Sequence, residues 1–253
     1  MFMVENHSLA EMRKHMPWTY RLARRYGYAT DYHAETHPSL PNYLAIAGGS
    51  TYGVRDDNNP SSHRLHGHSV FGLARRAGLT ARVYAESMPG HCTTVPAGEY
   101  AVKHNPWAYF VAERSLCGRF DTPMSRFARD VHHGHLPAAG MVIPNVCHDA
   151  HDCSLTRADA WLKKEVGLAM SGPDFKHGRL AIVITADEDD GSQGNKVLTT
   201  MVDPRVRGVV ARTRLNHYSL CRLYTQVLGL SPLRHARHAP SMAKAFALPL
   251  ARG

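Results

Sequence analysis

Four consecutive carboxylates, at positions 187–190, directly follow the apolar segment 181–186. The β-branched residues of that segment predict a strand that is buried on both faces of a parallel sheet. Adjacent carboxylates repel one another unless a cation lies between them, and hard oxygen ligands suit a divalent metal ion. Because ligands bind beyond the carboxyl ends of strands in open α/β sheets, the pattern predicts a metal or ligand site here. A solvated acidic loop is the alternative interpretation.

Two further polar clusters follow predicted strands. Glu5 and Asn6 come directly after the apolar residues 1–4, and the segment 148–152 follows the short predicted strand 140–143. Parallel strands bring their carboxyl ends to one edge of a sheet, so we expect all three clusters to share a site there. Taken singly, each cluster has a structural explanation, because Asn and Asp side chains satisfy turn backbone and loop histidines are usually solvated.

Ser39 stands two residues before Pro41, which is well placed to open a helix over 41–47. The N–H groups at a helix N-terminus attract anions. Two interpretations of the Ser39 hydroxyl follow. It caps the helix, or it is a nucleophile whose alkoxide is stabilised by a metal ion and by the helix dipole.

Predicted strands and helices alternate along the chain, which favours an α/β three-layer sandwich with a mainly parallel central sheet. No repeat or shift in composition divides the sequence, so we expect one domain over residues 1–253. The segment 52–65 predicts a loop, and 233–253 predicts a basic tail. We expect strands at 1–4, 28–32, 80–85, 140–143, 180–185 and 197–202, and helices at 8–16, 17–26, 41–47, 69–76, 155–170 and 218–228.

Charge restricts the class of partner. The chain has a formal charge of +9 and a pI near 9.5, so its surface attracts anions such as phosphoesters, anionic lipid or nucleic acid. The basic residues are scattered and are not interleaved with aromatic residues. A specific nucleic-acid partner is therefore not expected.

Cysteine usage indicates the compartment. The five cysteines form no C-x-x-C pair, which argues against a zinc ribbon or a thioredoxin-like motif. Cys92 with Cys117 and Cys147 with Cys153 are plausible disulfides, which leaves Cys221 in an apolar helical stretch, and disulfides imply export. The sequence shows no signal peptide and no transmembrane span, and residues 1–4 look like the end of a strand. We therefore expect the first strand to be truncated and any export signal to lie upstream.

Six short polar segments occur in an order that is typical of one enzyme family. With them, the chain resembles the phosphoesterase family that contains bacterial acid phosphatases and phospholipases C, within the alkaline phosphatase superfamily. The resemblance implies an alkaline-phosphatase-like fold. The six segments are Glu-Asn-His-Ser at 5–8, Thr-His-Pro-Ser-Leu-Pro-Asn-Tyr at 36–43, Lys-His-Asn-Pro at 103–106, Pro-Asn-Val-Cys-His-Asp-Ala-His-Asp-Cys at 144–153, Asp-Glu-Asp-Asp-Gly at 187–191 and Asn-His-Tyr-Ser-Leu at 216–220.

The resemblance implies one divalent metal ion, of unknown identity, beside a serine nucleophile. Related nucleotide pyrophosphatases place their nucleophile at the same position, which favours Ser39 over Thr36 or Ser50. The metal ligands implied are Glu5, Asn6, Asp187 and Glu188, with Ser39 as a further ligand.

The resemblance also implies a set of residues around the bound phosphoryl group. His148 or His151 would protonate the leaving alkoxide, a task that suits the pKa of imidazole. A disulfide between Cys147 and Cys153 would brace this histidine loop. The residues expected near the phosphoryl group are His104, Asn105, His148, His151 and Asp152.

Three departures from the family pattern have consequences. Lys196 stands where relatives often have a histidine, which favours a single-metal site and suggests contact of Lys196 with a phosphate oxygen as an alternative role. Ala186 replaces a frequent tryptophan, which alters packing only. A truncated first strand would leave Glu5 close to a fraying terminus and weaken metal binding.

These observations predict a metal-dependent acid phosphatase, that is, a phosphomonoesterase that is secreted or held in the cell envelope. Phosphate monoesters hydrolyse very slowly unaided, and catalysis rests on positioning and on neutralising the charge of the phosphoryl oxygens. The substrate would be a phosphorylated small molecule or a lipid headgroup such as a phosphoinositide, with peripheral contact of the basic surface with an anionic membrane. A phospholipase C or phosphodiesterase on the same fold is the alternative, and a basic anion-binding protein without enzymatic activity is the third hypothesis.

Overall fold

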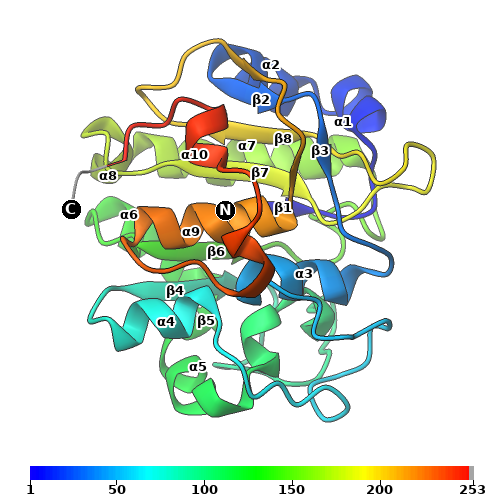
Figure 1. The fold of residues 1–253 in the computed structure, drawn as a ribbon, viewed down its shortest axis with the longest axis vertical. Coiled ribbons are helices and arrows are strands. Elements are labelled where there is room, and N and C mark those ends of the chain that lie inside the picture. Colours follow the sequence, from blue (N-terminus) through cyan, green and yellow to red (C-terminus); the bar gives the residue numbers. More distant parts are fainter. Residues whose placement is uncertain (251–253) are drawn as a thin grey trace.

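An eight-stranded sheet forms the centre of the molecule in the computed structural model, which describes residues 1–250 (Figure 1). A two-stranded sheet of β3 (Tyr32–His33) and β10 (Leu215–Asn216) accompanies it. The strands of the large sheet are, in chain order, β1 (Phe2–Val4), β2 (Gly27–Ala29), β4 (Ala81–Ala85), β5 (Asp121–Pro123), β6 (Ala139–Ile143), β7 (Ile182–Ala186), β8 (Thr199–Val202) and β9 (Val209–Ala211).

The strand order of the large sheet is β5-β4-β6-β1-β7-β8-β2-β9. Only β8 runs antiparallel to its neighbours, β7 and β2, so the predicted α/β fold with a mainly parallel sheet is confirmed. β1 lies between β6 and β7, with Phe2 aligned to Val142 on one side and to Ile184 on the other. All residues of β1 and β7 are buried, as their continuous apolar runs predict. The expectation of a fraying first strand was wrong, because β1 is central and Glu5, which follows it, is completely buried.

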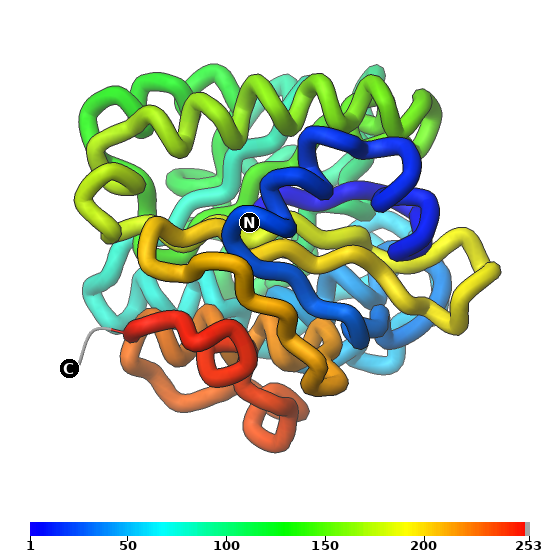
Figure 2. Tube along the Cα trace, turned by 90° about the horizontal axis from the view of Figure 1, so that it is seen from above, coloured from blue at the N-terminus to red at the C-terminus, as the bar shows by residue number. Residues whose placement is uncertain are grey.

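Helices cover both faces of the sheet, which gives the three layers seen in Figure 2. The long helix α7 packs with α1, α2, α6 and α8 on one face, and α9 packs with α3, α4 and α10 on the other. The helices are α1 (Leu9–His15), α2 (Pro17–Arg25), α3 (Ser39–Gly48), α4 (Val70–Arg76), α5 (Arg114–Phe120), α6 (Phe127–His132), α7 (Leu155–Ser171), α8 (Pro173–Lys176), α9 (His217–Val227) and α10 (Met242–Ala245), with 3₁₀ turns η1 (Val102–His104), η2 (Pro106–Tyr109), η3 (Val111–Glu113), η4 (Met124–Arg126) and η5 (Arg234–Arg237).

Serine caps start three of these helices where the sequence predicts them. The side chains of Ser8, Ser69 and Ser154 each accept a hydrogen bond from the backbone N–H three residues later. Each such cap stabilises its helix by about 1 kcal/mol. The starts of α1, α4 and α7 are therefore determined by the local sequence.

Two predicted strands differ from those observed. The predicted strand 28–32 divides into β2 and β3, because the chain leaves the large sheet after Ala29 and pairs with β10. The predicted strand 197–202 begins only at Thr199.

The predicted basic tail was wrong for the residues that the structure describes. η5 and α10 pack against α9, and Met242 and Phe246 are fully buried. Apolar residues spaced among the basic ones attach this segment to α9. The high density of basic residues hides this apolar pattern when the sequence is read for charge. Residues 251–253 of the predicted tail lie outside the described part.

The two plausible disulfides are both present. Cys92 bonds to Cys117 and Cys147 bonds to Cys153, while Cys221 is free and buried in α9. Among residues 1–250, no helix combines the length and apolar character needed to cross a membrane.

Candidate active site

Glu5 and Asp187 lie side by side because they follow neighbouring parallel strands. Val4 of β1 is aligned with Ala186 of β7, so both chains end at the same edge of the sheet. The Asn6 N–H donates to Asp187 Oδ1 at 3.0 Å, and the Glu5 N–H donates to the Asp149 carbonyl at 2.8 Å. The three polar clusters that follow β1, β6 and β7 are therefore gathered at the carboxyl edge of the sheet.

Ser39 points its hydroxyl into this cluster. It is the first residue of α3, it is almost completely buried, and its Oγ donates to Glu5 Oε2 at 3.0 Å. The N-cap position of α3 is Pro38, and no side chain of the cap residue closes the helix. The interpretation of the Ser39 hydroxyl as a helix cap is therefore not supported by its contacts.

His104 is held between two carboxylates at the bottom of the site. Its Nε2 lies 3.2 Å from Glu5 Oε2, its Nδ1 lies 3.1 Å from Asp149 Oδ2, and its ring stacks on Tyr43. Burial lowers the pKa of His104, but the charge of Glu5 and the contacts with Asp149 outweigh it and raise this pKa to about 10. Burial likewise raises the pKa of Glu5, and the positive His104 overrides it and lowers the pKa to about 2. His104 is therefore a buried imidazolium paired with Glu5.

Asp187 and Glu188 bring two further carboxyl groups into the cluster. Burial and then the charges of Glu5 and Glu188 raise the pKa of Asp187 well above its ordinary value. Burial raises the pKa of Glu188 to about 7, against the opposing effect of His37, whose Nδ1 lies 3.3 Å from Glu188 Oε1. The Asn42 side chain donates to Glu188 Oε2 at 3.1 Å. Like charges held this close in a buried place indicate a site for a cation.

The chemistry of the donors fits a divalent metal ion. Within residues 1–250, Asn6 Oδ1 and Asp187 Oδ2 are buried and accept no hydrogen bond, although a buried polar atom normally has a partner. Both are hard oxygen donors, as are the carboxylates beside them. Glu5, His104 and Asp149 also lie close enough to hold a metal, but His104 as an imidazolium carries a proton on both ring nitrogens and offers no lone pair to a metal. The oxygen atoms of Glu5, Asn6, Asp187 and Glu188 are the better candidates.

His151 and Asp152 lie at the entrance to the cluster. The His151 ring is 5.9 Å from the His104 ring, and its Nδ1 is 2.6 Å from Asp152 Oδ1. The side chain of Asp152 is 60% exposed, so this pair faces solvent on one side and the buried site on the other. The structure thus brings His104, His151 and Asp152 together.

His148 and Asn105 have contacts of a different kind. His148 Nδ1 is 3.0 Å from Glu86 Oε2, and its ring stacks on Trp161 of α7. The buried Asn105 side chain donates to Asp121 Oδ2 at 2.8 Å, next to the Cys92–Cys117 disulfide. In the described chain, neither side chain is in contact with the carboxylate cluster.

Lys196 also lies apart from the cluster. Its Nζ is 3.5 Å from Asp31 Oδ1, and its backbone bridges to His33. These contacts place Lys196 beside the small sheet of β3 and β10. They give no support to the expected contact between Lys196 and a phosphate oxygen.

Several site residues were not singled out from the sequence. Tyr43 donates to Glu5 Oε1, and Asp149 forms an ion pair with His104 through Oδ2 and accepts the His151 N–H through Oδ1. Lys103 and Asp57 pair at 2.9 Å on the rim of the site. Lys103 was part of a quoted motif, whereas Asp57 lies in the loop 52–65, where no periodic pattern distinguishes one polar residue from another.

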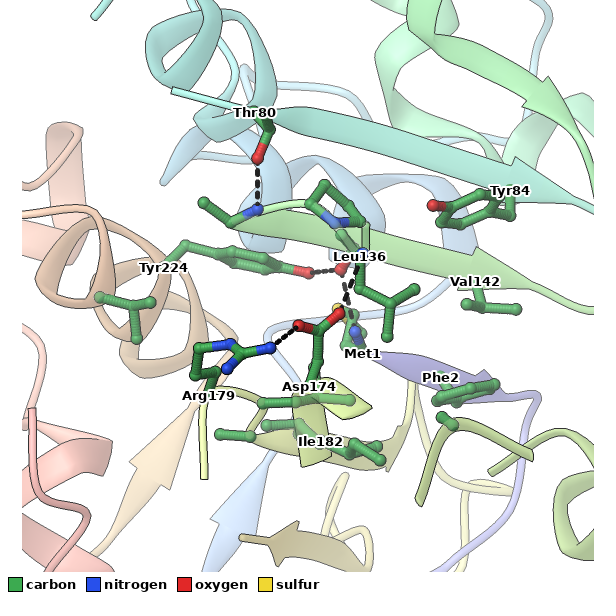
Figure 3. A pocket seen from close by; sticks show the side chains of 18 of the residues that line it. Met1, Phe2, Thr80, Tyr84, Leu136, Val142, Asp174, Arg179, Ile182 and Tyr224 are labelled. Carbon is green, nitrogen blue, oxygen red and sulfur yellow. Dashed lines mark hydrogen bonds and ion pairs between the residues drawn. The ribbon is translucent and has the colours of Figure 1, made fainter. Parts of the chain in front are cut away.

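The opposite edge of the sheet holds an apolar cleft of about 370 Å³ (Figure 3). Met1, Phe2, Gly140 and Ile182, at the amino ends of β1, β6 and β7, line it. None of the predicted site residues lines this cleft, so the candidate chemistry and the cleft lie at different edges.

Comparison with known proteins gives consistent results. The model of the phosphoesterase family matches residues 7–231. The chain is 33% identical over 242 residues to the phosphatidylinositol-3-phosphatase of Mycobacterium tuberculosis. The alignment covers 93% of this chain and 78% of that protein. It is 27% identical over 228 residues to the phosphate-repressible acid phosphatase of Penicillium chrysogenum. That alignment covers 84% of this chain and 54% of the fungal protein. The chain thus spans about half the length of this fungal relative.

Solved structures share the fold at low sequence identity. The lipoteichoic acid synthase LtaP of Listeria monocytogenes aligns with a TM-score of 0.64 and 8% identity, over 94% of this chain and 74% of that chain. A protein of the alkaline phosphatase superfamily from Vibrio parahaemolyticus aligns with a TM-score of 0.61 and 10% identity, over 99% of this chain and 70% of that chain. The predicted alkaline-phosphatase-like fold is confirmed.

Proposed function

Because this chain belongs to the phosphoesterase family, we propose that it is a metal-dependent phosphomonoesterase with Ser39 as its nucleophile. The family itself makes the chain a phosphoester hydrolase, as its acid phosphatase and phosphatidylinositol phosphatase relatives are. The metal, the nucleophile and the substrate are the parts that we add to it.

One observation carries the assignment of the nucleophile. Ser39 Oγ is buried at the N-terminus of α3 and donates to a carboxylate of Glu5, which leaves β1 beside Asp187 at the end of β7. A serine placed in this way has its proton on an acceptor and its oxygen at a helix N-terminus that favours negative charge.

We propose a two-step reaction. Ser39 Oγ loses its proton to solvent by way of Glu5 Oε2 and attacks phosphorus, and the bond from phosphorus to the alcohol oxygen breaks. Water then attacks the phosphoserine, phosphate leaves, and Ser39 Oγ regains a proton. His151 donates the proton to the departing oxygen through Nε2, which the Lys103 ammonium approaches to 3.3 Å in the free protein, while Asp152 fixes Nδ1. His104, as an imidazolium, offsets the charge of the phosphoryl oxygens.

A divalent metal ion, when bound by Glu5, Asn6, Asp187 and Glu188 with Ser39 as a further ligand, supplies an activated serine oxygen and neutralises phosphoryl charge. Of these residues, Glu5 also fixes the position of the serine, because its Oε2 accepts from Ser39 Oγ. We propose one such ion, because Lys196 pairs with Asp31 and offers no further ligand.

The substrate class follows from charge and from the relatives. A chain of charge +9 attracts phosphorylated headgroups, and the mycobacterial relative is named for a phosphoinositide. We propose phosphomonoesters of small molecules or lipid headgroups, at an anionic membrane in the latter case. Two disulfides support a secreted or cell-envelope protein.

The test is the variant Ser39→Ala, assayed with p-nitrophenyl phosphate. We expect kcat to fall by at least ~10³-fold, because removing a nucleophile leaves only binding and electrostatic effects. The control is Ser50→Ala, since Ser50 lies just beyond the other end of α3 and its Oγ accepts the Tyr52 N–H. Activity of Ser39→Ala near that of the control would move the nucleophile elsewhere. Faster hydrolysis of bis-p-nitrophenyl phosphate than of the monoester would make the protein a phosphodiesterase.

A further inference from the structure

Asp57 bridges two hydrogen-bond donors on the rim of the site. Its Oδ1 accepts the N–H of Leu40 at 2.9 Å, and its Oδ2 accepts from Lys103 Nζ at 2.9 Å. Leu40 directly follows Ser39, and Lys103 directly precedes His104. One carboxylate of the loop 52–65 thus occupies donors beside the proposed nucleophile and beside the buried imidazolium.

The Leu40 N–H is a donor that a bound anion would use. It lies in the first turn of α3, where backbone N–H groups have no partner inside the helix. Pro38 provides no side-chain cap, and Pro41 has no N–H, so few other groups serve this helix end. Such a helix start binds phosphate and carboxylate groups.

Lys103 is the second donor, and it faces the site. Its Nζ lies 3.3 Å from Nε2 of His151. Burial lowers the pKa of Lys103, but Asp57, Glu5 and Asp187 together raise it, so the ammonium is close to the acidic cluster and charged.

We propose that Asp57 is a carboxylate latch, which holds the Leu40 N–H and the Lys103 ammonium in the free protein and gives both up to the phosphoryl group of the substrate. The inference rests on the proposed function. Two oxygens on one centre reach an N–H and an ammonium at once, and a phosphoryl group offers the same arrangement with more charge. Asp57 is 28% exposed, so its side chain has open solvent to move into when it is displaced.

Two other roles for Asp57 predict different results. If Asp57 only caps α3, its removal lowers thermal stability and leaves phosphate binding unchanged. If Asp57 positions Lys103 for catalysis, its removal weakens phosphate binding and raises KM. A latch alone predicts tighter binding when the charge is removed.

The experiment measures binding of inorganic phosphate by isothermal titration calorimetry. It compares the wild type with Asp57→Asn and Asp57→Ser, at equal metal content, and determines KM and kcat for p-nitrophenyl phosphate in parallel. Asp57→Ser is the second variant because serine keeps a short acceptor for the helix end. The matched control is Asp56→Asn, which removes the same charge from the same loop at a carboxylate that is 49% exposed and paired with His63.

We expect Kd for phosphate and KM to fall about tenfold in the Asp57 variants, with kcat within about twofold of the wild type. The reason is that phosphate no longer has to displace a charged hydrogen bond, and the free energy of such a bond corresponds to about a tenfold change in affinity. Asp56→Asn should change neither by more than about twofold. In a Lys103→Met background, Asp57→Asn should tighten binding far less, because one of the two released donors is gone.

Unchanged or weaker phosphate binding in both folded Asp57 variants would overturn the latch. That result would leave the proposed function intact if hydrolysis still depended on Ser39. Conversely, tighter phosphate binding in a protein that hydrolyses no phosphomonoester would preserve the latch and refute the proposed function.

Discussion

At the carboxyl edge of the sheet, β1 and β7 lead into the buried carboxylates Glu5 and Asp187, whereas at the amino edge the same two strands begin beside an apolar cleft of about 370 Å³. Both ends are buried, but the side chains differ in what burial does to them. At the amino edge, residues such as Phe2 and Ile182 are stabilised by leaving water. At the carboxyl edge, burial raises the pKa of Asp187 because the charged form is disfavoured.

The difference shows that the two ends of the same strands serve different purposes, stability at the amino end and chemistry at the carboxyl end. Burying an apolar side chain contributes roughly 1.5–3 kcal/mol, and burying an unpaired carboxylate costs several kcal/mol. The two strands are fully buried and, apart from Thr185, apolar over their length, so the sheet can hold like charges together beyond its far end. A cation is then bound by groups that are unfavourable without it.

The largest expected effect comes from removing one of these charges. In Asp187→Asn we expect loss of the metal and a fall in kcat of at least ~10³-fold, because a ligand and its charge are gone. The melting temperature of the metal-free variant should rise above that of the metal-free wild type, by about 2–4 °C for each kcal/mol of relieved repulsion. Metal analysis of the purified protein, enzyme assay and calorimetry check the three parts.

Asp190→Asn is the control for this prediction. Asp190 belongs to the same acidic run but is exposed and contacts Ser192. It should keep both metal and activity. An Asp187→Asn variant that still held metal and turned over substrate would break the contrast between the two edges.

A change at the amino edge should act on stability alone. In Ile182→Ala we expect the free energy of unfolding to fall by about 2–5 kcal/mol, because a buried side chain beside the cleft is lost. Turnover per folded molecule should be unchanged, since no site residue lines the cleft. Urea unfolding measures the first quantity, and assays well below the melting temperature measure the second. The control is Val210→Ala, at a residue that is 41% exposed, which should lower the free energy of unfolding far less. Loss of turnover in folded Ile182→Ala would show that the two edges of the sheet are coupled.

The fold was predictable where a local signal coincides with a structural need. The apolar runs that became β1, β6 and β7 and the serine caps of α1, α4 and α7 were visible in the sequence. β5 and β9 have only three residues each and carry no periodic pattern, so they were missed. The sequence predicted a helix start at Pro41, but α3 begins at Ser39, which puts the serine inside the first turn instead of before it.

The candidate site was predictable to the extent that it follows strand ends. Glu5, Asn6 and Asp187 were expected together because the carboxyl ends of parallel strands meet at one edge. Tyr43 and Asp57 were not expected, since their places depend on how α3 and the loop 52–65 dock on that edge. Tertiary docking of this kind leaves no pattern in the sequence.

The last expected effect separates burial from repulsion among the buried carboxylates. Asp121 is fully buried near the Cys92–Cys117 disulfide but away from the other carboxylates, and burial, against the hydrogen bond from Asn105, raises its pKa from 3.8 to about 7. The folded protein therefore favours the protonated carboxyl group. Its contribution to stability is present below about pH 4 and is lost as the pH rises to about 7.

Asp121→Asn removes this dependence and keeps an acceptor for the Asn105 amide. Between pH 4 and pH 7, the wild type should lose stability relative to Asp121→Asn by at most ~1.4 kcal/mol per pH unit, and the difference should level off above pH 7. Urea unfolding of both proteins across this range, with disulfides oxidised, measures it. A flat difference would mean that burial alone does not disfavour a carboxylate in this protein, so that the high pKa of Asp187 would have to come from its charged neighbours.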